Sequence, residues 1–236
     1  EVLVWTDSSL YSLQYVGAGS GVWSATIVGE QTSIASANSV AYASGVSYWM
    51  GKDKFYKYDG STQPLPCDLR KYIFTDFNSE QYGQVFGGSN EAFNEVWWFY
   101  CSSSATDNDR YVVYNYLEHI WYYGSMARSA WLDSGLRAFP LAATFNSVLV
   151  NHEEGVDDNE TSTTAAIASF ITSADFDLED GDKFMLMSRV LPDISFEGST
   201  AANPVVTMSF FPLTSSGSGY NSPTSESGVS TGTATR

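Results

Sequence analysis

Carboxylates that could bind a metal ion gather in one short stretch of the C-terminal third of the chain. Four aspartates lie around Gly181: Asp175, Asp177, Asp180 and Asp182. Hard cations such as Ca²⁺ bind clustered carboxylate oxygens, but the spacing here differs from that of the helical calcium-binding loop. Phe176 and Leu178 alternate with the acids as they would along a strand. We therefore expect a β-turn with solvated acids, with a bound cation at the four aspartates as the alternative.

A second group of acids could supply the two carboxylates of a glycosidase. These are Glu153, Glu154, Asp157 and Asp158. A glycosidase places two such groups roughly 5–10 Å apart across a sugar. Sialidase-like propellers also need clustered arginines for an anionic substrate, and the arginines of this chain are few and scattered. An exposed acidic loop is the interpretation that we favour.

Nucleophilic and phosphate-binding motifs are absent from the sequence. The two histidines, His119 and His152, are not accompanied by the Gly-x-Ser-x-Gly turn that a Ser-His-Asp relay of that type would need. The glycine-rich segment 17–21 lacks the lysine and the following helix of a phosphate loop. We interpret it as a connection between strands, and we expect no catalytic and no cofactor-binding residues.

Cysteine usage and hydropathy narrow the class of protein further. Cys67 and Cys101 lack metal-ligand spacing and adjoin apolar runs, so we expect free thiols that are buried or half-buried. No apolar run approaches the roughly 20 residues needed to cross a bilayer. We therefore expect no membrane insertion by this chain.

Composition indicates strands and interfaces and disfavours nucleic-acid binding. Aromatic residues make up 15% of the 236 residues, and the net charge is −16, from 27 acidic against 11 basic residues. An acidic surface repels phosphate, so wrapping DNA or clinging to an anionic membrane is disfavoured. Stacking of single-stranded nucleic acid on the aromatic residues would also need a basic groove. Close packing between sheets is the better explanation of the aromatic content.

The elements that would position any site are short strands. The segment 94–116 predicts a β-hairpin joined through a polar loop, and residues 120–124 predict a third strand. Weaker hairpins are predicted over residues 2–15 and 46–58, and Asp59-Gly60 predicts a turn. Residues 68–74 could form a short helix or turn, and we favour irregular structure there.

Tryptophans lead these hairpins at nearly regular intervals. Trp5, Trp49 and Trp97 are separated by 44 and 48 residues. A period of about 40–50 residues built of short strands is that of β-propeller blades. The expected fold class is all-β, with propeller blades over residues 1–140 that belong to a larger propeller.

The sequence changes character after residue 140. We expect a hairpin-rich β platform domain over residues 141–213. Its predicted strands lie in five segments: 143–150, 163–172, 184–191, 194–196 and 205–211. Residues 214–236 are dominated by Ser, Thr and Gly, and we expect a loop or an arm there.

Three segments together resemble a family of phage proteins. Residues 94–133, 149–158 and 173–193 are similar to the propeller and the following region of tailed-bacteriophage neck and tail proteins. These are the packaged-DNA stabilisation proteins and the tail nozzle, or tail tubular protein B, of short-tailed phages. The matching stretch spans roughly residues 90–200 and consists of structural, aromatic motifs.

The resemblance implies a structural protein of the virion with no catalytic residues. It implies a homo-oligomer, expected as a hexameric ring, that forms the distal tail conduit for genome retention and ejection. Other phage tail proteins (the adaptor and the fibres) would be its partners, and genomic DNA would pass through the lumen without specific binding. Assembly would take place in the host cytoplasm. Further blades before Glu1 and further platform strands after Arg236 are expected as well.

Two other functions stay open at this point. One is a virion-associated glycan hydrolase on a propeller scaffold, and the other is a carbohydrate-binding propeller with exposed aromatic residues. Architecture alone does not separate them from a tail protein, because function depends on individual sites.

Overall fold

The computed structural model describes residues 1–17, 19, 21–135, 137–161, 163–167, 169–171, 173, 186, 188–197, 202–211 and 230–235. The chain divides into two compact units, residues 1–168 and 169–236. The boundaries expected at residues 140 and 213 stay predictions. The structure is predominantly β, in several antiparallel sheets, as the sequence predicts. The described strands do not form a closed barrel or propeller.

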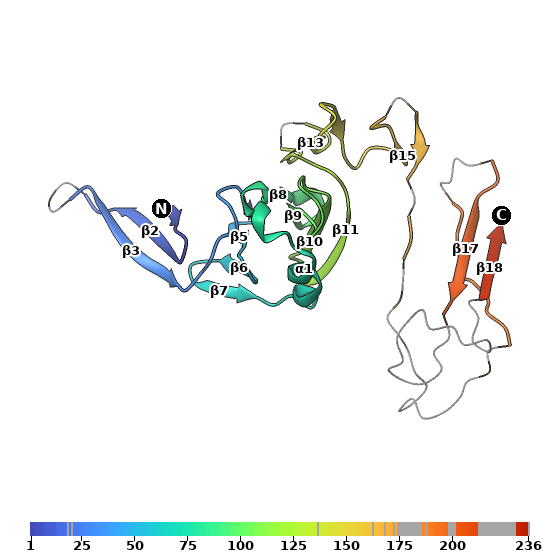
Figure 1. The fold of residues 1–236 in the computed structure, drawn as a ribbon, viewed down its shortest axis with the longest axis horizontal. Helices are drawn as coiled ribbons and strands as arrows, with labels where there is room; N and C mark the ends of the chain where they lie inside the picture. The colour runs from blue at the N-terminus through green and yellow to red at the C-terminus, as the bar shows by residue number, and fades with distance from the viewer. Residues whose placement is uncertain are drawn as a thin grey trace. The chain divides into compact units, whose positions relative to one another are not determined.

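Four antiparallel sheets make up most of the first unit (Figure 1). Sheet 1 contains β1 (Val2–Trp5), β2 (Ser9–Tyr15) and β3 (Trp23–Glu30). Sheet 2 contains β4 (Val40–Ala43), β5 (Val46–Met50), β6 (Phe55–Tyr58) and β7 (Thr62–Leu65). Sheet 3 contains β8 (Phe86–Asn90), β9 (Glu95–Tyr100), β10 (Arg110–Asn115) and β11 (Ile120–Ser125). Sheet 4 contains β12 (Ala130–Leu132), β13 (Leu141–Ala143) and β14 (Leu149–Asn151). In every sheet the strands follow one another in chain order.

Strand pairing and turn residues define the hairpins of the first unit. Strands β1 and β2, β5 and β6, and β9 and β10 pair as the three predicted hairpins. Ser44 and Gly45 close a further hairpin, β4–β5; both have positive φ, 52° and 83°, as a two-residue hairpin turn of the primed type requires. Gly60 has φ 110° in the predicted turn after β6. Pro64 lies in β7, which is an edge strand, so its missing N–H removes no central hydrogen bond. The three predicted hairpins and the strand at 120–124 are therefore confirmed.

The sheets stack face to face, and each contact is filled with large apolar side chains. Leu10 of sheet 1 packs with Trp49, Tyr56 and Tyr58 of sheet 2. The largest core lies between sheets 2 and 3 and includes Met50, Phe55, Trp98, Tyr100 and Val112, each fully buried. Phe86, Trp97, Phe99 and Val113 of sheet 3 pack against Trp131 of sheet 4. Consecutive sheets are thus joined by a shared core and not by pairing of their strands.

The first strands of sheets 2, 3 and 4 lie side by side. Strand β8 contacts β4 on one side and β12 on the other. Small residues make this approach possible: a Cβ on Gly87 would lie 3.2 Å from the Ser39 carbonyl oxygen, and one on Gly88 would meet the Trp131 ring. The Trp98 indole N–H donates to Ser39 O at 2.9 Å and so joins β9 to the start of β4.

Short helical segments connect sheet 2 to sheet 3 and lie within sheet 3. They are α1 (Arg70–Asp76), η1 (Ser79–Gln84) and η2 (Glu91–Phe93). The irregular structure favoured for residues 68–74 is therefore wrong. Helix α1 has no side-chain cap, and it is held by Ile73, which is fully buried in the core between sheets 2 and 3. Tertiary packing therefore makes this segment helical, and such packing cannot be recognised from the local sequence.

The region after sheet 4 has less regular structure than expected. Strands β15 (Asp157–Asp158) and β16 (Ala165–Ala166) form a small pair, so the long strand expected over 163–172 is wrong. Residues 167, 169–171 and 173 are not in strands. Residues 186 and 188–197 are not in strands either, and they include the strand expected at 194–196 and the described part of the strand expected at 184–191. Their apolar side chains are largely exposed, as at Ile171 and Leu186, so no core fixes them in a sheet.

In the second unit β17 (Val205–Phe210) pairs with β18 (Ser230–Thr235) along its full length. The strand expected at 205–211 is confirmed. Residues 230–235 form a strand, whereas the sequence analysis expects a loop or an arm over 214–236. Thr-rich segments pair readily with an existing strand.

Candidate interaction surfaces

The outer face of sheet 1 is an apolar surface that the described strands leave open. Side chains alternate along each strand, so one set faces sheet 2 and the other faces outward. The register places ten residues on the outward side: Val2, Val4, Ser9, Tyr11, Leu13, Tyr15, Trp23, Ala25, Ile27 and Glu30. Tyr15 is 65% exposed and Trp23 56% exposed. Glu30, at the end of β3, is the one charged residue of the ten, in a chain whose net charge is −16.

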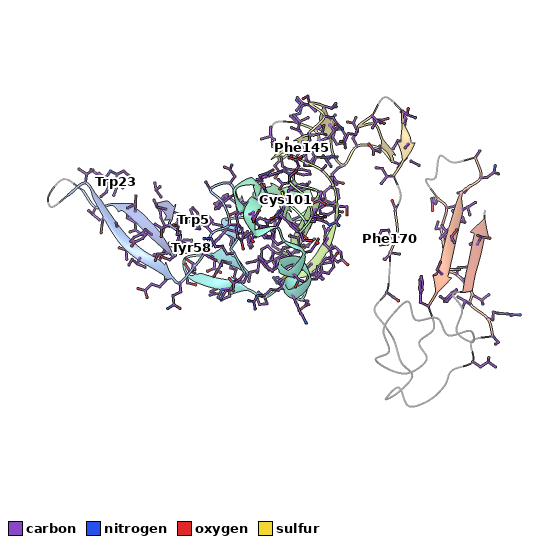
Figure 2. All side chains as sticks on the ribbon, in the orientation of Figure 1. Trp5, Trp23, Tyr58, Cys101, Phe145 and Phe170 are labelled. Carbon is purple, nitrogen blue, oxygen red and sulfur yellow. The ribbon has the colours of Figure 1, made fainter. Side chains whose placement is uncertain are left out.

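Trp23 marks the far end of this face (Figure 2). It pairs with Tyr15 across the β2–β3 hairpin, with ring centroids 5.9 Å apart in an edge-on arrangement. The opposite side of the same sheet is buried near the start of β2: Trp5 meets Trp49 of sheet 2 at 5.8 Å, and Leu10 is fully buried. Sheet 1 therefore has one face in a core and a second apolar face without one.

Sheet 4 has a similar outward face at the other end of the stack. Trp131, Ala142 and Val150 share the side that faces sheet 3, because Trp131 stacks on Trp97. The outward set is Ala130, Leu132, Leu141, Ala143 and Leu149, together with Asn151. Leu132 is 59% exposed and Leu149 is 67% exposed. The stack thus presents an open, mainly apolar face at both ends.

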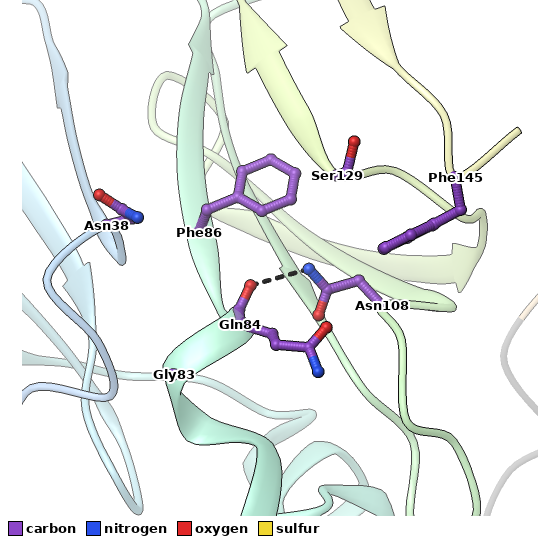
Figure 3. Close-up of a pocket in the computed structure, with 7 residues that line it drawn as sticks. All are labelled: Asn38, Gly83, Gln84, Phe86, Asn108, Ser129 and Phe145. Carbon is purple, nitrogen blue, oxygen red and sulfur yellow. Dashed lines mark hydrogen bonds between the residues drawn. The ribbon is translucent and has the colours of Figure 1, made fainter. Parts of the chain in front are cut away.

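A pocket of about 240 Å³ lies where the first strands begin (Figure 3). Asn38 precedes β4, Gln84 precedes β8 and Ser129 precedes β12, while Phe86 and Phe145 contribute two aromatic rings. The Asn108 amide donates to the Gln84 carbonyl oxygen at 2.8 Å and fixes the floor. No carboxylate, histidine or cysteine is among its lining residues, so the pocket offers hydrogen bonds and aromatic contact but no acid–base group.

Acidic side chains gather at the opposite end of the same strands. Asp133 accepts hydrogen bonds from Ser89 Oγ at 2.8 Å and from the Glu91 backbone N–H at 3.1 Å. Glu95 and Glu153 both lie beside the amide of Asn90 at the end of β8. Three carboxylates of sheets 3 and 4 therefore lie at this end.

The structure separates the residues that the sequence suggested for catalysis. Glu153, Glu154, Asp157 and Asp158 are all exposed, as expected for an acidic loop. His119 contacts Tyr114, with 2.8 Å between Nδ1 and the hydroxyl oxygen, while His152 accepts from Arg128 Nε at 2.9 Å. Neither arrangement includes a serine or cysteine nucleophile.

The arginines and cysteines are also apart from one another. Arg70, Arg110 and Arg128 pair with different carboxylates, those of Asp53, Asp76 and Glu160, and do not form a cluster. Cys101 is buried and Cys67 is half-buried, and both are free thiols, as expected.

The four metal candidates Asp175, Asp177, Asp180 and Asp182 lie outside the described residues. Within the described part of the chain, no group of three or more His, Cys, Asp or Glu side chains could hold a metal ion. No helix in that part is long and apolar enough to cross a membrane.

Sequence reasoning missed the two open sheet faces as sites. The alternation of apolar residues in 2–15 and 23–27 was the available signal, but a strand pattern alone does not show which face a neighbouring sheet covers. No protein-family model and no curated protein matches this chain.

Proposed function

We propose that this chain is a structural, non-enzymatic subunit of a bacteriophage tail, part of the ring or nozzle that forms the distal conduit for genome retention and ejection. In this proposal sheets 1 to 4 are consecutive blades of a larger β-propeller. The resemblance of residues 90–200 to phage neck and tail proteins supplies the biological setting. The single observation that carries the assembly role is the open, mainly apolar face at each end of the stack.

The order of the sheets supports the propeller. Propeller blades are antiparallel sheets of about four strands, arranged radially around a central channel. Sheets 2 and 3 have four strands each in chain order, and β4, β8 and β12 lie beside one another. Glycines in β8 allow the close approach that inner strands need.

The open faces of sheets 1 and 4 are evidence for contacts with further sheets, as in the wall of a ring. Exposed contiguous apolar patches on soluble proteins mark interaction sites. The face of sheet 1 and the face of sheet 4 differ from each other, so copies joined through them would contact head to tail. Head-to-tail contacts close into a ring when the rotation between copies permits it. A homo-oligomer, in the proposal a hexamer, is therefore compatible with these two surfaces.

The charge of the chain supports passage of DNA rather than binding. Six chains at −16 each would carry about −96 before counterions. Negative walls repel phosphate, which reduces adhesion to a genome that must leave quickly. Adaptor and fibre proteins of the tail would be the other partners, the virion tail would be the location, and assembly would take place in the host cytoplasm.

Electron microscopy of phage particles that carry this protein tests the proposal. Antibodies against the chain, or a fused tag, should label the tail axis, and averaged views down that axis should show a ring, with six-fold symmetry in the simplest case. Label on the capsid alone, or a monomeric protein that releases reducing ends from host polysaccharide, would contradict it. The second result would instead support the glycan hydrolase.

A further inference from the structure

The pocket at the start of the first strands has one fixed aromatic wall and one exposed aromatic wall. Phe86 is buried, and its ring stacks on Phe99 with centroids 4.8 Å apart, so it cannot easily move. Phe145 lies across from it and is 41% exposed. The two rings stand on either side of the Asn108 side chain (Figure 3). A ligand that enters here would therefore meet aromatic surface and an amide at the same time.

The backbone around Phe145 is held although its ring is exposed. Phe145 lies in the turn between β13 and β14, directly after Thr144, which is buried. The Thr144 N–H donates to the Val148 carbonyl oxygen at 2.9 Å, and the Thr144 hydroxyl oxygen accepts from the Val148 N–H at 3.3 Å. The turn thus presents a large apolar ring at the rim of the pocket, where a ligand would cover it.

The polar groups of the pocket have hydrogen-bonding capacity left. The Gln84 side chain uses its Nε2 to donate to two oxygens, and among the described residues no donor bonds its Oε1 atom. Asn108 Oδ1 accepts only the Cys101 thiol, which is a weak donor. The Asn38 amide forms no side-chain hydrogen bond within the described part of the chain, and the Ser129 hydroxyl donates to a backbone carbonyl but can still accept. Both donors and acceptors are therefore available to a ligand.

The absence of charge restricts the class of ligand. None of the described residues that line the pocket is charged. An ionic ligand would lose hydration there without gaining a partner of opposite sign, which is unfavourable. A purely apolar ligand would cover the amides and the hydroxyl without bonding them, which is also unfavourable. The ligand that fits is uncharged, with an apolar face for the rings and hydroxyl groups around its edge.

We propose that this pocket binds one neutral sugar ring of a glycan. The C–H face of the sugar packs on the exposed ring of Phe145, and its hydroxyl groups bond Gln84 Oε1, the Asn38 amide and Ser129. The volume of about 240 Å³ is below the roughly 300–1,000 Å³ of pockets for drug-sized ligands, so a single ring is the unit bound.

The site binds the glycan without cleaving it. Hydrolysis of a glycosidic bond needs a pair of carboxyl groups, and no carboxylate is among the lining residues. This binding site does not rest on the proposed function, because it involves neither the open sheet faces nor the phage assignment.

Saturation-transfer NMR of the whole chain with four neutral sugars tests the inference: glucose, galactose, mannose and N-acetylglucosamine. At least one of them should receive saturation at its ring C–H protons. A ligand of about a dozen non-hydrogen atoms at the usual ligand efficiency has a Kd on the order of 10⁻³ M. Glucuronate, which adds a carboxylate to glucose, should bind about tenfold more weakly than glucose or not at all.

Phe145→Ala should weaken binding of the same sugar about tenfold, because its apolar contact with the C–H face is lost. Phe145→Tyr keeps the ring and should bind within about threefold of the wild type. Phe93→Ala is the matched control: Phe93 is 49% exposed and lies in η2, at the opposite end of β8 from the pocket. Its removal should leave sugar binding unchanged.

Two results would overturn the inference. One is the absence of saturation transfer to all four neutral sugars at roughly 10 mM, a concentration above the expected Kd. The other is an equal loss of binding in the Phe145→Ala and Phe93→Ala variants, which would show unspecific contact of sugars with exposed aromatic rings.

Discussion

Trp131 of sheet 4 stacks on Trp97 of sheet 3, with ring centroids 5.2 Å apart and planes 15° from parallel. The Trp131 indole N–H donates to the Ser89 carbonyl oxygen at 2.7 Å, so the ring is fixed over β8. This contact holds the last sheet of the stack against its neighbour. It leaves room for glycine alone at position 88.

Gly88→Ala should therefore destabilise the first unit. The new Cβ would meet the Trp131 ring, with Cγ at 3.0 Å, and the ring cannot withdraw without losing its stacking and its hydrogen bond. Overpacking of this kind costs about 1–3 kcal/mol. Chemical denaturation of the variant and the wild type measures the difference.

Gly83→Ala is the control for this substitution. A Cβ at Gly83 has no atom within 4 Å, so the change should leave the free energy of unfolding within about 1 kcal/mol of the wild type. Equal stabilities of Gly88→Ala and the wild type would mean that the Trp131 contact is not tight.

The free energy of unfolding should fall as the pH is lowered through the range in which His152 is neutral in the folded chain but protonated in the unfolded chain. Burial, and after it the charge of Arg128, lower the pKa of His152 from 6.5 to about 4. Between these values the unfolded chain binds a proton that the folded chain does not, so stability is lost as the pH falls from 6.5 toward 4. The shift corresponds to at most about 3 kcal/mol.

His152→Gln isolates this contribution. Glutamine can still accept from Arg128 Nε through its amide oxygen but does not titrate. Unfolding free energies measured from pH 7 to pH 4 should fall less steeply in the variant than in the wild type. Parallel curves would show that His152 titrates normally in the folded state.

The two thiols should react slowly while the chain is folded. Burial raises the pKa of Cys101 to about 11, with a smaller contribution from Asp109, and burial raises that of Cys67 to about 12. The thiolate is the reactive form, so reaction with a disulfide reagent at pH 8 should be roughly a hundredfold slower than in denaturant. Rapid labelling of Cys101 in the folded protein would contradict the burial of this thiol.

Much of the first unit follows from the sequence, because hairpin signals are local. Alternating aromatic and β-branched residues predict the strands of 46–58, with Gly51 at the turn, and those of 94–116, with a polar loop between them. Helix α1 was missed because it depends on Ile73 reaching a core that distant residues build. Alternation predicts a strand over 163–172, but among the described residues of that segment only Ala165 and Ala166 pair in a sheet.

The spacing of the tryptophans predicts the strands correctly, but it does not predict which face of its sheet each tryptophan occupies. Trp49 faces sheet 1, where it meets Trp5, whereas Trp97 faces sheet 4. Trp98 occupies the place equivalent to Trp49, because both face the preceding sheet. A shift of one residue along a strand moves a side chain to the opposite face. Sequence period alone therefore could not show which tryptophan joins which pair of sheets.

The open sheet faces had no signature that reasoning from local sequence could find. The outer face of sheet 1 becomes a candidate surface only once the register assigns Tyr15 and Trp23 to one side.

Sedimentation equilibrium of the wild type and two variants of strand β3 tests the central claim most directly. Ile27→Glu puts a charge on the open face of sheet 1. Thr26→Glu is the control: Thr26 is the adjacent residue, it is also exposed, and its side chain is on the opposite side of the sheet. The account predicts that the wild type and Thr26→Glu form the same oligomer. Ile27→Glu should raise the Kd of self-association at least tenfold, because the new charge must be desolvated when the face is covered. Wild-type chains that stay monomeric at all concentrations, or an Ile27→Glu variant that assembles as the wild type does, would contradict a wall built through these faces.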